Sequence, residues 1–214
     1  DPKRITCRTR SGASFGSERL VLALPPRLAI ERIAFSPALD DPVVRTMRAI
    51  PTWMAGHAKF VAIYETAFWR EAGLSGDGIS QRGPLMEIHD ASPFDGSCGA
   101  LFGFLGWPAE KRREAGAGIA RDVIEQLARM FGEPAGNPVH GFFQDWIDEP
   151  WTATEADLAV PGHHPAYGMP GELMHLWDGR LMLAGAELGN EHGGLLEGAL
   201  ASAETALAAL TRAC

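Results

Sequence analysis

Apolar residues recur along the first half of the chain in patterns that predict strands. Residues 3–26 predict two strands joined by a Gly/Ser turn, and two prolines close the run RLVLALPP, which is typical of a buried strand in a parallel sheet. Large apolar residues alternate along HAKFVAIYETAFW, which predicts a strand covered on both faces. Further strands are predicted over residues 85–90 and 98–105, with Gly-rich loops between them.

Two segments carry helical patterns. A short helix is predicted to begin near Asp41, with Pro42 in its first turn. A long amphipathic helix is predicted over PAEKRREAGAGIARDVIEQLARMFG, from the Trp107-Pro108 pair to Gly132. The apolar residues on one side of it are Ile119, Val123, Ile124, Leu127 and Phe131.

The last part of the chain combines a strand, a glycine-rich turn and a helix. The strand is predicted over GRLMLAGAE, the turn over LGNEHGG and an Ala-rich helix over LLEGALASAETALAALTRA. Backbone N–H groups at a helix start lack partners, and the helix dipole adds positive charge there, so this arrangement can hold an anion or a polarised carbonyl oxygen. Glycine also occurs in such turns for steric reasons alone, so this feature by itself is weak evidence.

Composition narrows the function classes. The 214 residues, at about 150 per domain, hold one large domain or two interleaved small ones, and 46% apolar with 21% charged residues is typical of a soluble globular protein. A net charge of −8 disfavours a nucleic-acid partner. We expect no membrane span, because no apolar run approaches the ~20 residues that one needs. Three widely spaced cysteines without a C-x-x-C pair indicate reduced thiols and a cytoplasmic location.

Other chemistries find little support in the sequence. The histidines show no spacing that places two metal ligands on one helical face, so no metal site is predicted. No G-x-S-x-G elbow indicates a serine hydrolase. The His89-Asp90 pair is either an acid–base pair or a hydrogen bond at a strand end, and the second reading is favoured.

A lysine and an aromatic cluster each allow two interpretations. Lys59, on an otherwise apolar strand, is either a functional lysine or an edge lysine that reaches solvent. An aromatic cluster either lines a pocket or belongs to the core, and we expect it in the core. Its members are Phe142, Phe143, Trp146 and Trp151.

Three segments in order resemble one known family. They are LALPPRLAIERIAFSPALD, AKFVAIYETAFWR, and DWIDEPW followed by GRLMLAGAELGNEHGGLLEGALASAETALAAL, and they are similar to the C-terminal part of the flavin-containing monoamine oxidases. The resemblance covers nearly the whole chain. It implies an α+β fold, in which a mixed or antiparallel sheet with helices forms a substrate-binding domain. The other strand and the C-terminal helix would belong to an incomplete FAD-binding α/β domain. The implied domains are strands of the FAD-binding domain at 1–26, the substrate-binding domain at 27–165, and the return to the FAD-binding domain at 166–214.

The resemblance also implies cofactor-binding residues. Gly185, Ala186 and Glu187 would lie near the phosphates and ribityl chain of FAD. The amides of Leu195 and Leu196 would face the pyrimidine edge of the flavin, where helix-start donors stabilise the charge of the reduced ring. A further set at the start of the helix would hold the turn and let the helix pack close to the cofactor: Gly194, Glu197, Gly198 and Ala199.

In the family a lysine at the position of Lys59 holds a water near the reactive flavin nitrogen and assists reoxidation by oxygen. The two aromatic rings that commonly frame the amine fall at Ala156 and Leu195, neither of which is aromatic. Either the substrate is not a typical arylalkyl amine, or another ring, that of Trp151 or Trp53, takes over the role. Glu155 stands where some members attach FAD through cysteine, so non-covalent FAD is expected.

The G-x-G-x-x-G motif that opens such enzymes is absent from these residues. We therefore expect the C-terminal portion of an FAD-dependent amine oxidase that produces hydrogen peroxide, needs a missing N-terminal half or partner chain, and is inactive as an isolated chain. Two alternatives stay open. One is another flavoprotein oxidoreductase of the superfamily, such as a desaturase or a protoporphyrinogen-oxidase-like enzyme, and the other is a non-catalytic binding module.

Overall fold

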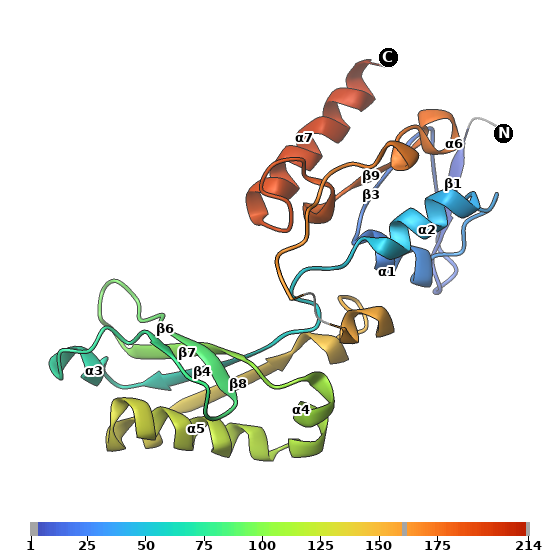
Figure 1. Cartoon of the computed structure of the whole chain (residues 1–214). Coiled ribbons are helices and arrows are strands. Elements are labelled where there is room, and N and C mark those ends of the chain that lie inside the picture. The colour runs from blue at the N-terminus through green and yellow to red at the C-terminus, as the bar shows by residue number, and fades with distance from the viewer. Residues whose placement is uncertain (1–3, 160–161, 213–214) are drawn as a thin grey trace. The chain divides into compact units, whose positions relative to one another are not determined.

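The computed structural model describes residues 4–159 and 162–212 (Figure 1). The chain divides into two compact units. The terminal unit consists of Asp1–Ala55 and Pro150–Cys214, and the middle unit consists of Gly56–Glu149. The assignment of chain segments to an FAD-binding and a substrate-binding domain stays a prediction.

The middle unit is built on an antiparallel sheet. Its strand order, among the described residues, is β5-β6-β7-β4-β8. The strands are β4 (Ala58–Tyr64), β5 (Gly78–Ile79), β6 (Leu85–Asp90), β7 (Gly99–Leu105) and β8 (His140–Asp145). The strands predicted within HAKFVAIYETAFW and over 85–90 and 98–105 are confirmed as β4, β6 and β7. No strand was expected at β8, which pairs with β4.

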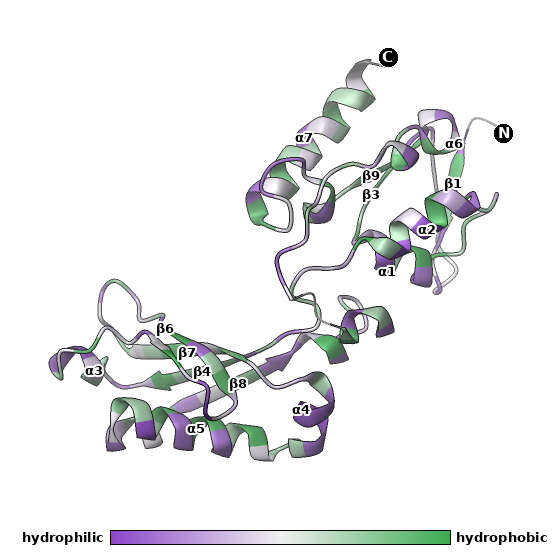
Figure 2. Cartoon of the chain, in the orientation of Figure 1, coloured by the Kyte–Doolittle hydropathy of each residue, from purple (hydrophilic) through white to green (hydrophobic). Residues whose placement is uncertain are grey.

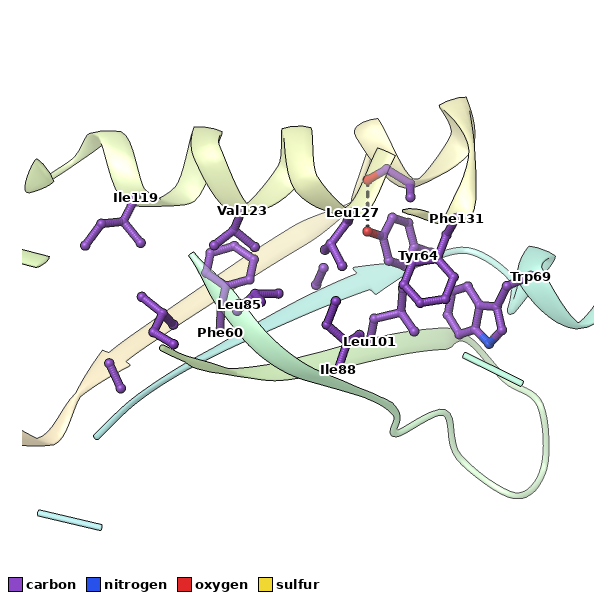
Figure 3. Close-up of a cluster of buried hydrophobic side chains, with 14 residues drawn as sticks. Phe60, Tyr64, Trp69, Leu85, Ile88, Leu101, Ile119, Val123, Leu127 and Phe131 are labelled. Atoms are coloured by element: carbon purple, nitrogen blue, oxygen red, sulfur yellow. Dashed lines mark hydrogen bonds between the residues drawn. The ribbon is translucent and has the colours of Figure 1, made fainter. Parts of the chain in front are cut away.

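One face of this sheet packs against α5 (Gly118–Phe131). Figure 3 shows Ile119, Val123 and Leu127 of the helix above Phe60 and the other core side chains of the sheet. Apolar and polar residues alternate along α5, as Figure 2 shows. Because each fully buried side chain of this kind contributes about 1.5–3 kcal/mol, this cluster is the main stabilising core of the middle unit. The second face of β4, which we expected to be covered, is only half-buried.

The single helix predicted over the PAEKRREAGAGIARDVIEQLARMFG stretch is wrong. The structure has two helices here, α4 (Ala109–Ala115) and α5, and the chain turns between them at Gly116, whose φ of 49° favours glycine. Arg112 in α4 is buried and pairs with Asp145 at the end of β8, 2.6 Å between Nε and Oδ2. This ion pair joins α4 to strand β8 of the sheet, so α4 does not continue into α5 as one straight helix.

The prediction that the aromatic cluster belongs to the core is also wrong. The exposed fractions are 60% for Phe142, 40% for Phe143, 37% for Trp146 and 65% for Trp151. Phe142 and Phe143 lie on β8, which stands at the end of the described strand order, so the side chains of this strand have neighbours on one side only. The middle unit also contains three short elements: α3 (Phe68–Glu71), η1 (Glu133–Gly136) and η2 (Trp146–Asp148).

The terminal unit contains a parallel pair of strands, β3 (Leu20–Ala23) and β9 (Leu181–Ala184). This confirms a parallel strand within RLVLALPP and a strand within GRLMLAGAE. Within residues 4–26 the structure forms three strands instead of the two expected, because β1 (Ile5–Arg8) and β2 (Ser14–Ser17) pair as a hairpin before β3.

Helices surround this strand pair. They are α1 (Pro26–Arg32), α2 (Asp41–Ala49), α6 (Leu176–Gly179) and α7 (Leu196–Arg212), with short turns η3 (Glu155–Leu158), η4 (Gly171–Leu173) and η5 (Ala186–Leu188). The predicted starts of α2 and α7 are confirmed. Met47 of α2 and Leu181 of β9 belong to the core of this unit. Within the described ranges, no helix combines the length and apolar character that crossing a bilayer requires.

Candidate functional site

The middle sheet has an outer face, which we define as the face that points away from α5. Strand register places Lys59 of β4 opposite Phe104 of β7 and Gln144 of β8, and Phe104 opposite Glu87 of β6. Directly paired residues share a face, so these four side chains form one row across the sheet. The row is flanked by Phe102, which pairs with the next outward residue of β4.

Lys59 lies against the aromatic rings of this face. Its Nζ is 4.7 Å from the ring centroid of Phe104 and 4.9 Å from that of Phe102, within the range in which a ring face attracts a cation. The side chain is half-buried, and β4 has strand partners on both sides, so Lys59 does not lie on an edge strand. It is the second residue of β4, so the interpretation as a lysine that reaches solvent at the strand end stays open. The structure therefore holds the ammonium in one place, and its chemical role stays a prediction.

His89 and Asp90, neighbours in the sequence, do not form a pair. The His89 Nδ1 is 3.1 Å from Asp77 Oδ1, and its ring lies 5.1 Å from that of Phe102 on the outer face. Successive residues of a strand point to opposite faces, and Asp90 accepts hydrogen bonds from the Trp69 indole and the Arg70 guanidinium. Burial alone would raise the pKa of Asp90, but these hydrogen bonds outweigh burial and hold the pKa well below its usual range. The acid–base interpretation of the dipeptide therefore has no geometric basis.

The glycine-rich turn of the terminal unit is closed by hydrogen bonds within the chain. The Gly185 amide donates to the Ser202 hydroxyl of α7 at 3.1 Å, and the Gly194 amide donates to the Ala186 carbonyl at 2.9 Å. Gly185 and Gly194 have φ values of 140° and 79°, which other residues rarely adopt. A Cβ on Gly198 would collide with the carbonyl of His192, so this glycine is needed by the turn itself.

The start of α7 presents open donors. The Leu195 amide is engaged, because it donates to the His192 carbonyl at 3.1 Å, and the Ala199 amide donates to the Leu195 carbonyl at 3.1 Å. Between them, the amides of residues 196–198 have no acceptor among the described residues. The structure thus offers the Leu196 amide, and not that of Leu195, to an external acceptor.

Glu187 is buried at the centre of the turn, with 7% of the residue exposed. Burial raises the pKa of its carboxyl, and the negative charge of Asp157 adds to that effect. Asp157 itself is paired with Arg27, 2.6 Å between Oδ1 and Nη1. The carboxyl of Glu187 therefore binds its proton more readily than an exposed glutamate does.

Three aromatic side chains from distant segments meet at the same turn. The Trp53 ring lies 4.9 Å from the His164 ring, which lies 5.6 Å from the Tyr167 ring. The structure therefore brings Trp53, a predicted substrate residue, to the turn that holds Gly194, a predicted cofactor residue. Sequence reasoning missed His164 and Tyr167, and no local pattern marks them.

The other two predicted substrate residues are exposed. Ala156 lies in η3, and Trp151 precedes it with the Arg10 guanidinium 6.0 Å from its ring centroid. The described part of the structure shows no contact that joins them to Trp53, so the three do not yet define one pocket.

A separate cavity of about 530 Å³ lies between β9 and α7 and contains none of the predicted residues. Its lining includes Leu181 and Leu183 of β9, Ser202 and Ala206 of α7, and Arg19. In addition, Leu200 and Leu207 of α7 are about 60% exposed, at 61% and 60%.

Comparison with known proteins shows which family the chain resembles. The family model described as flavin containing amine oxidoreductase matches residues 1–210. The "probable flavin-containing monoamine oxidase A" of Dictyostelium discoideum is 30% identical over 210 residues, which cover 94% of this chain and 44% of that protein. The putrescine oxidase of Kocuria rosea is 33% identical over 156 residues, covering 68% of this chain and 30% of that protein.

A solved structure shows the same fold. The cyclohexylamine oxidase from Brevibacterium oxydans superposes with a TM-score of 0.78 at 22% identity, over 99% of this chain and 46% of that chain. The chain thus spans less than half the length of the curated relatives that it matches.

Proposed function

Because the chain belongs to the family of flavin-containing amine oxidoreductases, we propose that it is the C-terminal portion of an FAD-dependent oxidase that deaminates a small-molecule amine and produces hydrogen peroxide. The observation that carries the proposal is the start of α7, where the amides of residues 196–198 have no acceptor among the described residues and Leu196 is exposed. Since the chain spans less than half of its relatives, the proposed activity is that of the complete protein.

The donors in the turn fit FAD. Open amides at a helix start are suited to the carbonyl oxygens at the edge of a flavin, and Gly194 lets the backbone turn sharply just before them. When bound, FAD supplies the electron acceptor for the amine and passes the electrons to oxygen. The open amides and the dipole of α7 would stabilise negative charge on the ring, with Leu196 as the first donor and Leu195 and Ala199 shaping the turn.

The strand end before η5 would hold the rest of the cofactor. We propose that Gly185, Ala186 and Glu187 lie along the ribityl chain and phosphates, as the family resemblance implies. The raised pKa of Glu187 supports this, because a carboxyl that binds its proton more readily than an exposed glutamate repels a phosphate less. Glu155 stands in place of the cysteine that anchors FAD in some members, so we propose non-covalent binding.

Lys59 is proposed as the residue that holds a water for flavin reoxidation. Lys59 is half-buried and its ammonium lies against the rings of Phe102 and Phe104, which supports this role because a positioned cation can orient a water. We propose that the rings of Trp53 and of Trp151, which is 65% exposed, attract the substrate ammonium, and that Ala156 stands where the family has one of its framing rings.

A missing N-terminal half or partner chain would complete the cofactor site. Two features support this: the cavity between β9 and α7, and the exposed side chains of Leu200 and Leu207 on α7. An amphipathic helix normally packs its apolar face against another part of the protein, so we expect a further segment to cover this face of α7. We therefore propose that the isolated chain is inactive and binds FAD weakly. The cysteines Cys7 and Cys98 are free thiols, which supports a cytoplasmic location.

The test compares the isolated chain with the complete protein that contains it. The complete protein should bind FAD, and its visible absorbance should bleach when an amine is added without oxygen. A panel should include putrescine and cyclohexylamine, the amines named for the similar oxidases. If the complete protein binds FAD and no amine bleaches it, amine oxidation is the wrong reaction.

A further inference from the structure

We propose that Tyr167 is a positioning residue, whose ring and hydroxyl hold the Gly193-Gly194 turn, and with it the start of α7, against the chain at Pro51. The functional meaning rests on the proposed flavin site at that helix start. The contact itself belongs to the terminal unit alone and can be tested without any cofactor.

The Tyr167 ring lies directly on the backbone of the turn. A Cβ on Gly193 would collide with the Tyr167 Cβ, and a Cβ on Gly194 would come within 2.7 Å of the Tyr167 Cε2. Such distances leave no room for any side chain, so both glycines are needed by the contact with the tyrosine. Movement of the turn in this direction is blocked by a rigid ring.

The hydroxyl fixes the other end of the ring. Tyr167 donates a hydrogen bond to the Pro51 carbonyl at 2.9 Å, across 116 positions of sequence. Burial raises the pKa of Tyr167 to about 12, and the negative charge of Glu187 adds to it, so the phenol keeps its proton and stays a donor at neutral pH. The ring is therefore held at both ends.

The held turn leads straight into the first turn of α7. The Gly194 amide donates to the Ala186 carbonyl, and the Ala199 amide donates to the Leu195 carbonyl. Both bonds depend on where residues 193–195 lie. Loss of the tyrosine should therefore loosen these two hydrogen bonds before it affects the strand pair β3 and β9.

The protein supplies its own control. Tyr64, in the middle unit, also donates from its hydroxyl to a backbone carbonyl, that of Ala135, at 2.9 Å (Figure 3). Its ring packs with the side chains of Phe68 and Trp69 rather than on the backbone of a turn. A Tyr64→Phe variant therefore removes an equivalent hydrogen bond without touching α7.

The first test is amide hydrogen exchange on the 214-residue chain. In Tyr167→Ala the Gly194 and Ala199 amides should exchange about tenfold faster, and in Tyr167→Phe about threefold faster, which is the effect expected of one lost hydrogen bond. Tyr64→Phe should leave both rates unchanged. If Tyr167→Ala fails to fold, the Phe variant decides. Equal acceleration of these amides and those of β9 would overturn the proposal.

The second test uses the complete protein with FAD. Tyr167→Phe and Tyr64→Phe should lose similar thermal stability, but only Tyr167→Phe should weaken FAD binding, by several-fold. Equal FAD affinity in the two variants would overturn the link to the cofactor. If the unchanged protein binds no FAD, the flavin proposal fails instead, and the exchange experiment still decides the positioning role.

Discussion

Lys59 and Phe104 are direct cross-strand partners on β4 and β7, and the lysine ammonium lies 4.7 Å from the centre of the phenylalanine ring. The contact joins a cation to a ring face on the outer face of the sheet. This placement gives the proposed oxygen-handling role of Lys59 a physical basis.

We predict that Lys59→Met slows flavin reoxidation by oxygen in the complete protein while the fold stays intact. The stability loss should be about 0.5–1 kcal/mol, the value of an exposed cation–ring contact. Lys111→Met is the matched control, because its ammonium lies 4.0 Å from the Trp107 ring centroid in the same unit. Stopped-flow measurement of oxygen kinetics checks this. Equal reoxidation rates in the two variants would mean that Lys59 has no such role.

Gly194→Ala should lower flavin retention in the complete protein. The residue has φ 79°, and a Cβ there would lie 2.7 Å from the Tyr167 ring. Gly179→Ala is the control, because Gly179 has φ 76° but a Cβ there would meet no described atom within 4 Å. Backbone strain of about 1–2 kcal/mol should affect both variants, and overpacking should add about 1–3 kcal/mol only at Gly194. FAD content after gel filtration measures the effect, and full retention in Gly194→Ala would count against the turn as a flavin site.

Removing Arg112 should strongly destabilise the middle unit. Its guanidinium is buried and bonded to both oxygens of Asp145, and it also donates to the Trp107 and Gly56 carbonyls. Arg112→Met leaves a buried carboxylate without its partner, which costs about 3–5 kcal/mol. Urea unfolding of the chain measures the loss.

The control for Arg112 is Arg121→Met, because Arg121 pairs with Asp122 on the surface and its side chain is 73% exposed. Such a pair contributes about 0–1 kcal/mol. Equal losses of unfolding free energy in the two variants would show that the buried pair contributes no more stability than the exposed pair.

The stability of the chain should depend on pH through Glu187 and Asp90 in opposite directions. Burial raises the pKa of Glu187, so the folded chain binds a proton that the unfolded chain has released, and stability is lost as pH rises through the folded pKa. Glu187→Gln should therefore gain stability over the unchanged chain as pH rises above the ordinary glutamate pKa of 4.5.

Asp90 should do the reverse. Its hydrogen bonds hold its pKa low, so it stabilises the fold above the ordinary aspartate pKa, and that contribution is lost as pH falls through the folded pKa. Asp90→Asn should be less stable than the unchanged chain at neutral pH, with the difference shrinking in acid. Urea titrations across pH measure both variants, and a pH-independent difference in either would contradict the account.

Much of the fold follows from local patterns. Strands β3, β4, β6, β7 and β9 and helices α2 and α7 lie where apolar periodicity, prolines and glycines predict them. The break at Gly116 was missed because the helical pattern continues on both sides of it. Strand β8 was missed because His140–Asp145 shows no alternation of buried and exposed residues, and its burial pattern in the structure is exposed nearly throughout.

The residues of the candidate site also fall into two groups, those that a local sequence pattern marks and those that only the fold brings together. Lys59 and the Gly194 turn stand out locally, as a charge on an apolar strand and as glycines before a helix. Tyr167 does not, because its partner Pro51 is 116 positions away and only the folded chain brings them together. The Asp77 partner of His89 is likewise a product of strand pairing, while the sequence neighbour Asp90 points to the other face.

The central claim is that these residues form part of a flavin-dependent amine oxidase. The most direct measurement is the visible spectrum of the complete protein under anaerobic addition of amines, followed by admission of oxygen. The account predicts bound, non-covalent flavin whose absorbance bleaches with an amine and returns with oxygen as hydrogen peroxide forms. A complete protein that holds no flavin, or whose flavin no amine bleaches, would contradict it.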